Sequence, residues 1–362
     1  MIRIFAAAGL GLIISLFGTK LLISWLNRLG VGQPIHTDLA EYHTTKKGTP
    51  TMGGIAIVGA AVISYIISAA YRGVYTTRGL LVMGAIGGAG LVGFVDDFIK
   101  VRNERNLGLN KRAKMAGLLT VAITFSVLLV VLTEQHTDLS STGRLGSIGW
   151  ELGKVGWVLW AVFLIIGFSN ATNLTDGLDG LLAGSSIFAF MAFLIIAFWS
   201  FRNEFVERRV LGIVVERVKV YDLTPQGLEL AVIAAAMVGA CAGFLWWNAA
   251  PAKIFMGDTG SLAIGTALAC LALTTNTVLL LPIIGALFVA ETLSVIVQVI
   301  SFRFFGGRRV FRMAPIHHHF EMGGWPETTV IIRFWMMSAV ATAAGVGIYY
   351  YDFLRATGTL SR

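Results

Sequence analysis

Charged side chains are scarce in this sequence. Asp, Glu, Lys and Arg make up 13% of its 362 residues, whereas 56% are hydrophobic and the mean hydropathy is +0.76. Ordinary soluble domains carry about 25% charged residues, so a soluble fold of ordinary composition is excluded. Apolar runs of about 20 residues, separated by short polar connections, match helices that cross a hydrocarbon core about 30 Å thick. The sequence therefore predicts an all-α polytopic membrane protein.

Cysteine is almost absent as well. Cys241 and Cys270 both lie in apolar runs, which supports neither a disulfide framework nor a cysteine metal site and indicates packing residues. The HExxH spacing of zinc peptidases and the GxxxxGK[ST] order of a Walker A loop are both missing. No internal repeat or low-complexity segment divides the chain. We therefore expect one integral membrane domain over residues 1–362.

About ten transmembrane spans are predicted from the apolar runs. They cover roughly 3–27, 53–71, 79–99, 115–133, 155–172, 177–200, 228–248, 259–276, 278–302 and 330–353. The first run has no small-residue cleavage site after it, so an uncleaved span is favoured over a signal peptide. Spans seven to nine are the least regular, because Asn276 and Pro282 interrupt what could be one longer run.

Basic residues in the loops indicate the orientation. Connections after odd-numbered spans hold fourteen Lys and Arg residues, against nine after even-numbered spans. The excess favours cytoplasmic odd loops and therefore places both termini in the periplasm. The net charge of +8 arises in these loops, which indicates contact with anionic headgroups and substrates rather than with nucleic acid. Alternation from Val210 to Val220 predicts an outer hairpin within the connection 201–227.

The polar clusters whose side chains could take part in catalysis or binding all fall on the odd loops. The active site is therefore expected on the cytoplasmic face. Residues 79–95 carry no charge and lead directly to Asp96 and Asp97. Two carboxylates at the edge of such a helix need a water-filled site or a cation. The other clusters are His43–Gly54, Asn170–Gly180, Asn248–Ser261 and Arg303–Glu327.

Acids in three of these clusters suit Mg²⁺, which typically takes one or two carboxylates together with phosphate oxygens. In the cluster Asn170–Gly180, polar residues recur every three positions, which predicts one polar stripe on a helix that leads into span six. The stripe is formed by Asn170, Asn173, Asp176 and Asp179. Gly257 and Gly260 flank Asp258 and permit a tight loop near phosphate oxygens. Helix caps and plain turns are the structural alternatives, and the shared face favours function.

Histidine and one isolated acid complete the set of candidates. His317, His318 and His319 are adjacent, point in different directions and therefore do not favour zinc. They suit phosphate contact or proton handling beside the arginines of residues 303–312, or simply a solvated loop. Glu291 lies among apolar residues of span nine, where a carboxylate is a functional candidate that could also pair inside the bundle.

Five segments resemble, in sequence and in order, the motifs of the polyprenyl-phosphate N-acetylhexosamine-1-phosphate transferases. They are Lys46–Gly54 (KKGTPTMGG), Gly93–Lys100 (GFVDDFIK), Asn170–Gly180 (NATNLTDGLDG), Pro251–Ser261 (PAKIFMGDTGS) and Pro315–Glu321 (PIHHHFE). The resemblance extends from the first span to the last. It implies a catalytic set of Asp96, Asp97, Asp258 and His317, with Asp258 as the metal ligand. It further implies substrate-binding roles for Lys47, Asn173, Asp176, Asn248, Phe255, His318 and His319, with Phe255 under the uracil.

The resemblance implies an Mg²⁺-dependent phosphoglycosyl transferase of the bacterial cytoplasmic membrane. The Pro315–Glu321 segment favours the members that use a muramoyl-pentapeptide donor. The expected reaction moves phospho-N-acetylmuramoyl-pentapeptide from its UDP carrier to undecaprenyl phosphate, giving lipid I and UMP, and the family suggests a homodimer. A sister transferase that uses UDP-N-acetylglucosamine and an ion-coupled transporter are the alternatives. Direct attack and a covalent aspartyl-phosphate both stay open, as do the separate roles of Asp96 and Asp97.

Overall fold

The computed structural model describes residues 1–28, 48–70, 75–102, 108–140, 147–210, 213–219 and 226–356 of the chain. Helices dominate this part of the chain, which confirms the predicted all-α class. Nine of the described helices are long and apolar enough to cross a membrane. A tenth apolar helix, α2, is shorter and spans Gly54–Ala70. Together these ten helices correspond to the ten predicted spans.

The long helices are α1 (Ile2–Arg28), α3 (Thr77–Arg102), α4 (Lys111–Leu132), α5 (Gly153–Thr175), α6 (Leu181–Arg202), α7 (Gln226–Asn248), α8 (Gly257–Thr274), α10 (Ala286–Phe304) and α12 (Glu327–Ala356). Two short helices are α9 (Leu281–Ile284) and α11 (Ile316–Glu321). Two antiparallel hairpins pair β1 (Asp138–Ser140) with β2 (Ser147–Glu151) and β3 (Phe205–Val210) with β4 (Ile213–Lys219). The second hairpin confirms the one expected in the connection 201–227.

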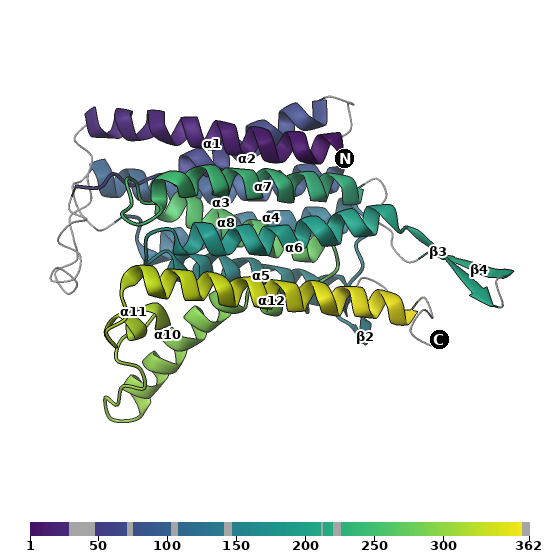
Figure 1. The fold of residues 1–362 in the computed structure, drawn as a ribbon. Coiled ribbons are helices and arrows are strands. Elements are labelled where there is room, and N and C mark those ends of the chain that lie inside the picture. The colour runs from purple at the N-terminus through teal and green to yellow at the C-terminus, as the bar shows by residue number, and fades with distance from the viewer. Residues whose placement is uncertain are drawn as a thin grey trace.

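The two ends of the bundle differ (Figure 1). The start of α1, the end of α12 and the hairpin of β3 and β4 lie at one end, whereas α11 and the connection from α7 to α8 lie at the other. This arrangement agrees with the prediction that the chemically interesting loops share one face. Which face of the membrane that is stays a prediction, based on the distribution of Lys and Arg.

The core lies around α8, nearly all of whose residues are buried. Because α8 is covered on all sides by protein, its small and apolar residues pack against α3 and α5 rather than against lipid. On the outside of this core, α7 packs closely against α1. A β-carbon on Gly239 or Gly243 would overlap the α1 backbone at Ala8 and Leu12, so glycine permits this close approach.

Two predicted features are wrong in detail. Span nine is not continuous from residue 278, because Pro282 lies in the first turn of the short α9 and Gly285 separates α9 from α10. The polar stripe is also broken: α5 ends at Thr175, Asp176 follows it as the capping residue, and Gly180 adopts a φ of 79° before α6 begins. Span six therefore starts at Leu181, four residues later than predicted. It follows a turn whose last residue, Gly180, has a positive φ that glycine adopts readily.

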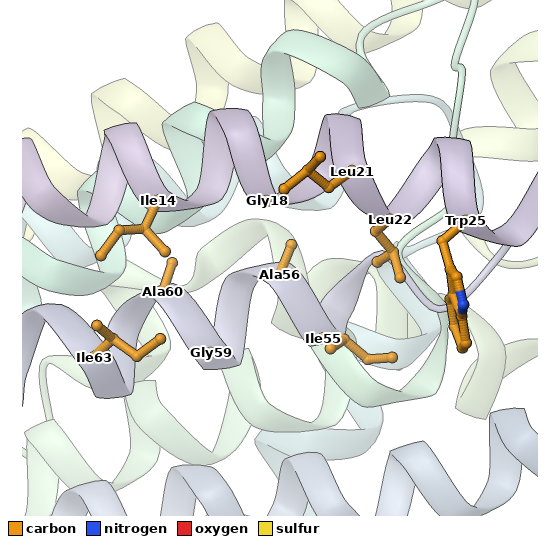
Figure 2. Close-up of a pocket in the computed structure, with 10 residues that line it drawn as sticks. All are labelled: Ile14, Gly18, Leu21, Leu22, Trp25, Ile55, Ala56, Gly59, Ala60 and Ile63. Atoms are coloured by element: carbon orange, nitrogen blue, oxygen red, sulfur yellow. The ribbon is translucent and has the colours of Figure 1, made fainter.

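An apolar groove of about 340 Å³ runs between α1 and α2 (Figure 2). Every residue that lines it is apolar or glycine, including Trp25 of α1 and Ile55 and Ile63 of α2. Gly18 and Gly59 face open space, with no atom within 4 Å of a β-carbon built on either. The groove therefore has the character of a lipid-facing surface and offers nothing to a phosphate.

Candidate active site

Three carboxylates from two helices meet at the end of the bundle that carries α11. Asp96 and Asp97 lie near the end of α3, and Asp258 is the second residue of α8. One oxygen from each lies within 4.8 Å of the others, and all three side chains are buried. Buried carboxylates so close together repel one another, so they need cations or strong hydrogen-bond donors. The three predicted catalytic aspartates are thus brought into one cluster.

Glycine allows the two helices to approach so closely at this point. Gly93 lies on α3 one turn before Asp97, and a β-carbon there would overlap the backbone of Asp258 and Thr259. Any larger residue would push the start of α8 away from α3. The apolar, glycine-rich run that precedes the two acids therefore sets the spacing of the cluster.

Asp97 caps α8 from a neighbouring helix. Its carboxylate accepts hydrogen bonds from the backbone N–H of Asp258 at 3.1 Å, from the N–H of Thr259 at 2.9 Å and from Thr259 Oγ1 at 2.8 Å. The residue before α8, Met256, provides no side-chain cap. A carboxylate at a helix N-terminus satisfies orphan N–H groups and interacts favourably with the helix dipole. Asp97 thereby fixes Asp258 relative to α3.

Asp96 has a different environment from its neighbour. Its Oδ1 accepts a hydrogen bond of 2.7 Å from the N–H of Leu109, in the connection that leads to α4. Its Oδ2 lies 2.6 Å from Lys100 Nζ, one turn along α3. One oxygen of Asp96 is therefore held by backbone and the other by a side chain, whereas both oxygens of Asp97 are held by α8.

Two lysines converge on Asp258 and were not among the predicted site residues. Lys100 Nζ and Lys114 Nζ each lie 2.7 Å from Asp258 Oδ2. Lys100 could have been found from the sequence, because it follows Asp96 by four residues and Asp97 by three on one helix. Lys114 could not, because only the packing of α4 against α3 brings it to the cluster.

The other oxygen of Asp258 faces α5. Asn173 Nδ2 donates a hydrogen bond to Asp258 Oδ1 and a second one, of 2.9 Å, to Ser261 Oγ. The predicted site residue Asn173 therefore lies beside the acids, and its amide group orients the Asp258 carboxylate. Four elements, α3, α4, α5 and α8, now contribute side chains to one centre.

Asp176 lies in the turn after α5, outside the membrane-spanning helices. Desolvation raises the pKa of this carboxyl to about 8, with further increases from the charges of Asp258, Asp97 and Asp179 and an opposing hydrogen bond from the Gly257 N–H. At neutral pH this side chain is therefore largely protonated, and its OH can donate a hydrogen bond to an anion. This protonation state suits a residue that borders a phosphate site.

Asn248 and Asp179 tie two loops together around the site. Asn248 Oδ1 accepts a hydrogen bond of 3.1 Å from the Gly180 N–H, and its Nδ2 donates one of 2.9 Å to the Ile254 carbonyl. Asp179 Oδ2 accepts one of 2.9 Å from the Ala252 N–H. The amide group of Asn248 is thus engaged with backbone, and its predicted role at the substrate stays a prediction.

The segment before α2 pairs with the segment before α8. The N–H of Phe255 donates to the Pro50 carbonyl at 2.8 Å, and the N–H of Gly53 donates to the Phe255 carbonyl at 2.9 Å. Phe255 itself is half-buried. Two of the sequence motifs are thereby held side by side at the site. The predicted binding residue Lys47 belongs to the first motif and lies outside the described residues.

The three adjacent histidines have three different partners. His317 is fully buried, and its Nδ1 lies 3.0 Å from Oε2 of Glu291, which is also fully buried. A β-carbon on Gly177 would overlap His317 Nε2, so that nitrogen faces the turn that follows Asp176. His318 Nδ1 lies 2.7 Å from Glu321 Oε2, and His319 Nδ1 accepts a hydrogen bond from the Arg312 N–H. Only His317 approaches the α5–α6 turn through these contacts.

Comparison with known proteins extends this picture. The profile of glycosyl transferase family 4 matches residues 79–276, and signature 1 of the phospho-N-acetylmuramoyl-pentapeptide-transferases matches residues 46–58. A phospho-N-acetylmuramoyl-pentapeptide-transferase of Streptomyces avermitilis is 47% identical over 97% of this chain and 98% of its own length. One of Rhodococcus jostii is 48% identical over 99% of this chain and its entire length. The chain belongs to this transferase family.

Membership of the family agrees with the geometry of the site. The match to family 4 includes Asp96, Asp97 and Asp258 and ends before α10. The shorter signature covers the segment that pairs with Phe255. Glu291 and His317 lie beyond both matched segments, and the structure alone brings them together. The chain is accordingly a multi-pass protein of the bacterial cytoplasmic membrane with the fold and motifs of a phosphoglycosyl transferase.

Proposed function

We propose that the chain transfers phospho-N-acetylmuramoyl-pentapeptide from its UDP carrier to undecaprenyl phosphate, forming lipid I and UMP in peptidoglycan synthesis. The observation that carries the proposal is the cluster of three buried carboxylates and two lysines at one end of a membrane-spanning bundle. Such a cluster suits a reaction between a lipid-borne phosphate and a water-soluble diphosphate. Near-full-length relatives whose names carry this activity support the choice of substrates.

The donor set of the cluster fits a hard divalent cation such as Mg²⁺. Asp96, Asp97 and Asp258 offer carboxylate oxygens within 4.8 Å of one another, and no sulfur ligand competes among the described residues of the cluster. We propose Asp258 as the principal ligand, because both lysines gather at its Oδ2. When bound, the ion would offset the negative charge of the diphosphate and of the acceptor phosphate.

The side chains of the site have separable tasks. Lys100 and Lys114 supply permanent positive charge where two anionic substrates must approach each other. The acceptor is already largely dianionic at neutral pH, because the second pKa of a phosphate monoester is about 6, so positioning matters more than deprotonation. We assign that positioning to Asp96, because Asp97 is committed to the start of α8.

Two chemical routes fit this arrangement. In the first, an oxygen of the acceptor phosphate attacks the β-phosphorus of the donor, and the bond to UMP breaks. In the second, an aspartate carboxylate attacks first and releases UMP, and the acceptor then attacks the aspartyl-phosphate. Release of one equivalent of UMP from donor alone supports the covalent route. UMP release that strictly requires the acceptor supports direct attack.

The transporter alternative loses its strongest support. It rested on Glu291, a carboxylate deep in an apolar span. In the structure this carboxylate contacts His317 of α11, so it lies beside the residues that surround the site. The sister transferase that uses UDP-N-acetylglucosamine is the remaining competitor.

A donor comparison tests the proposal. Purified chain in detergent is incubated with Mg²⁺, undecaprenyl phosphate and either UDP-N-acetylmuramoyl-pentapeptide or UDP-N-acetylglucosamine, and UMP is measured. We expect UMP from the muramoyl-pentapeptide donor only. UMP from UDP-N-acetylglucosamine alone would identify a sister transferase, and UMP from neither would contradict the enzyme proposal. Sizing of the same preparation tests the homodimer that the family resemblance suggests.

A further inference from the structure

Lys100 occupies the centre of the three carboxylates. Its Nζ lies 2.6 Å from Asp96 Oδ2, 2.7 Å from Asp258 Oδ2 and 3.7 Å from Asp97 Oδ1. Lys114 lies equally close to Asp258 Oδ2 and has the same 22% exposure. The two ammonium groups therefore share one oxygen, but only Lys100 also contacts the acids of α3.

A divalent ion and the Lys100 ammonium compete for the same oxygens. Mg²⁺ binds carboxylate oxygens at about 2.0–2.1 Å and requires near-octahedral geometry. A cation at that distance from Asp258 Oδ2 would lie within a few ångströms of an ammonium that is 2.7 Å from the same atom. Like charges at such separations repel strongly in a partly buried site. A divalent ion at these oxygens therefore disfavours the ammonium that now contacts them.

We propose that Lys100 is an exchangeable occupant of the metal site. Its ammonium offsets part of the negative charge of the three acids before the divalent ion binds, and it leaves them when the ion takes its place. The released ammonium stays attached to α3 beside the site, where it is free to pair with a phosphate oxygen of a substrate. The exchange rests on the proposed metal-dependent function. It assigns Lys100 a positioning role before metal binding, at the acids, and another after metal binding, at a substrate phosphate.

Mn²⁺ affinity of single-lysine variants tests the exchange. Free Mn²⁺ is followed by electron paramagnetic resonance with purified wild type, Lys100→Met and Lys114→Met, without substrate. If Lys100 occupies the site, its removal tightens Mn²⁺ binding by about tenfold, whereas removal of Lys114 gives only a small gain from the lost positive charge. Equal tightening in the two variants, or no tightening in Lys100→Met, would overturn the proposal.

Asp258→Asn separates this inference from the proposed function. If wild type does not bind Mn²⁺, or if Asp258→Asn binds it equally well, the metal site itself is wrong. If Mn²⁺ binding depends on Asp258 but is not tightened by Lys100→Met, only the exchange is wrong. Thermal unfolding of each variant in the same detergent identifies any preparation that is not folded.

Amine labelling tests the exchange without a substitution. The wild-type chain is treated briefly with an acylating reagent, with and without Mg²⁺, and modified lysines are quantified by mass spectrometry. We expect Mg²⁺ to raise the labelling of Lys100 several-fold, because its ammonium is released from the acids. The exposed Lys111, at the start of α4, is the internal control and should be unaffected. Unchanged or lower labelling of Lys100 would contradict the exchange.

Discussion

Buried carboxylates occur at both ends of α3, in contrasting surroundings. At its start, fully buried Glu229 of α7 accepts hydrogen bonds from the Tyr65 hydroxyl at 2.8 Å and from the Thr76 N–H at 2.6 Å. At its end, Asp96 and Asp258 share the ammonium of Lys100. The first carboxylate is held by a tyrosine hydroxyl and a backbone N–H, whereas each acid of the second pair has the Lys100 ammonium as one of its partners.

The contrast separates a structural acid from a functional one. Burial alone does not distinguish them, because Glu229 is even less exposed than the three aspartates. The two kinds of acid are distinguished by the groups that contact their carboxylates. The buried Tyr65 hydroxyl and the Thr76 N–H are fixed by the packing of the fold, but a 22% exposed lysine can exchange with another cation. The predictions below test this difference, from the largest expected effect to the smallest.

The largest contrast is expected between Asp258→Asn and Glu229→Gln. Asp258→Asn removes the carboxylate that both lysines contact and should lower turnover on the order of a hundredfold or more. Glu229→Gln replaces one carboxylate oxygen with an NH₂ group, which cannot accept a hydrogen bond from Tyr65 or Thr76. This change should cost about 1–3 kcal/mol of stability. Turnover per folded molecule of Glu229→Gln should match wild type. A large loss of its turnover, with stability unchanged, would contradict the distinction.

An intermediate effect is expected at the pair of Glu291 and His317. If His317 handles a proton or a phosphate, His317→Ala should lower turnover by about a hundredfold. Glu291→Gln keeps a side chain of the same size beside His317 but removes the negative charge, so a loss of about tenfold is expected. Adding Glu291→Gln to His317→Ala should then cost nothing further. Fully multiplicative losses would show that Glu291 acts independently of His317.

The smallest effect is expected in the pH dependence of Asp176. Because its pKa is raised to about 8, the folded chain retains a proton that the unfolded chain releases near pH 4. Stability from this group is therefore lost as pH rises from about 4 through 8. Asp176→Asn has no proton to lose, so its melting temperature relative to wild type should increase between pH 6 and pH 9 in metal-free buffer. A constant difference would contradict the raised pKa.

Much of the architecture follows from the sequence, because lipid-facing helices leave a simple signal. Long apolar runs predicted ten spans, and ten apolar helices are present among the described residues. The break between α9 and α10 was harder to predict. Pro282 marks it, but the position of Gly285 against Phe168 depends on packing that no local pattern encodes.

The candidate site was predictable where acids lie close in sequence and less so where helices bring distant residues together. Asp96 and Asp97 were evident as charges at the end of an apolar run. Lys114 was not, since its 2.7 Å contact with Asp258 requires α4 to pack against α3. The partner of Glu291 was equally hidden, because His317 lies 26 residues further along the chain.

Metal dependence of UMP release tests the central claim most directly. Wild type and Asp258→Asn are treated with chelator, and UMP is measured with UDP-N-acetylmuramoyl-pentapeptide and undecaprenyl phosphate before and after addition of Mg²⁺. The account predicts that wild type loses UMP release on chelation and regains it with Mg²⁺, while Asp258→Asn does not recover. Release from wild type that survives chelation, or Mg²⁺ rescue of Asp258→Asn to the wild-type rate, would contradict a metal-dependent transferase centred on the three aspartates.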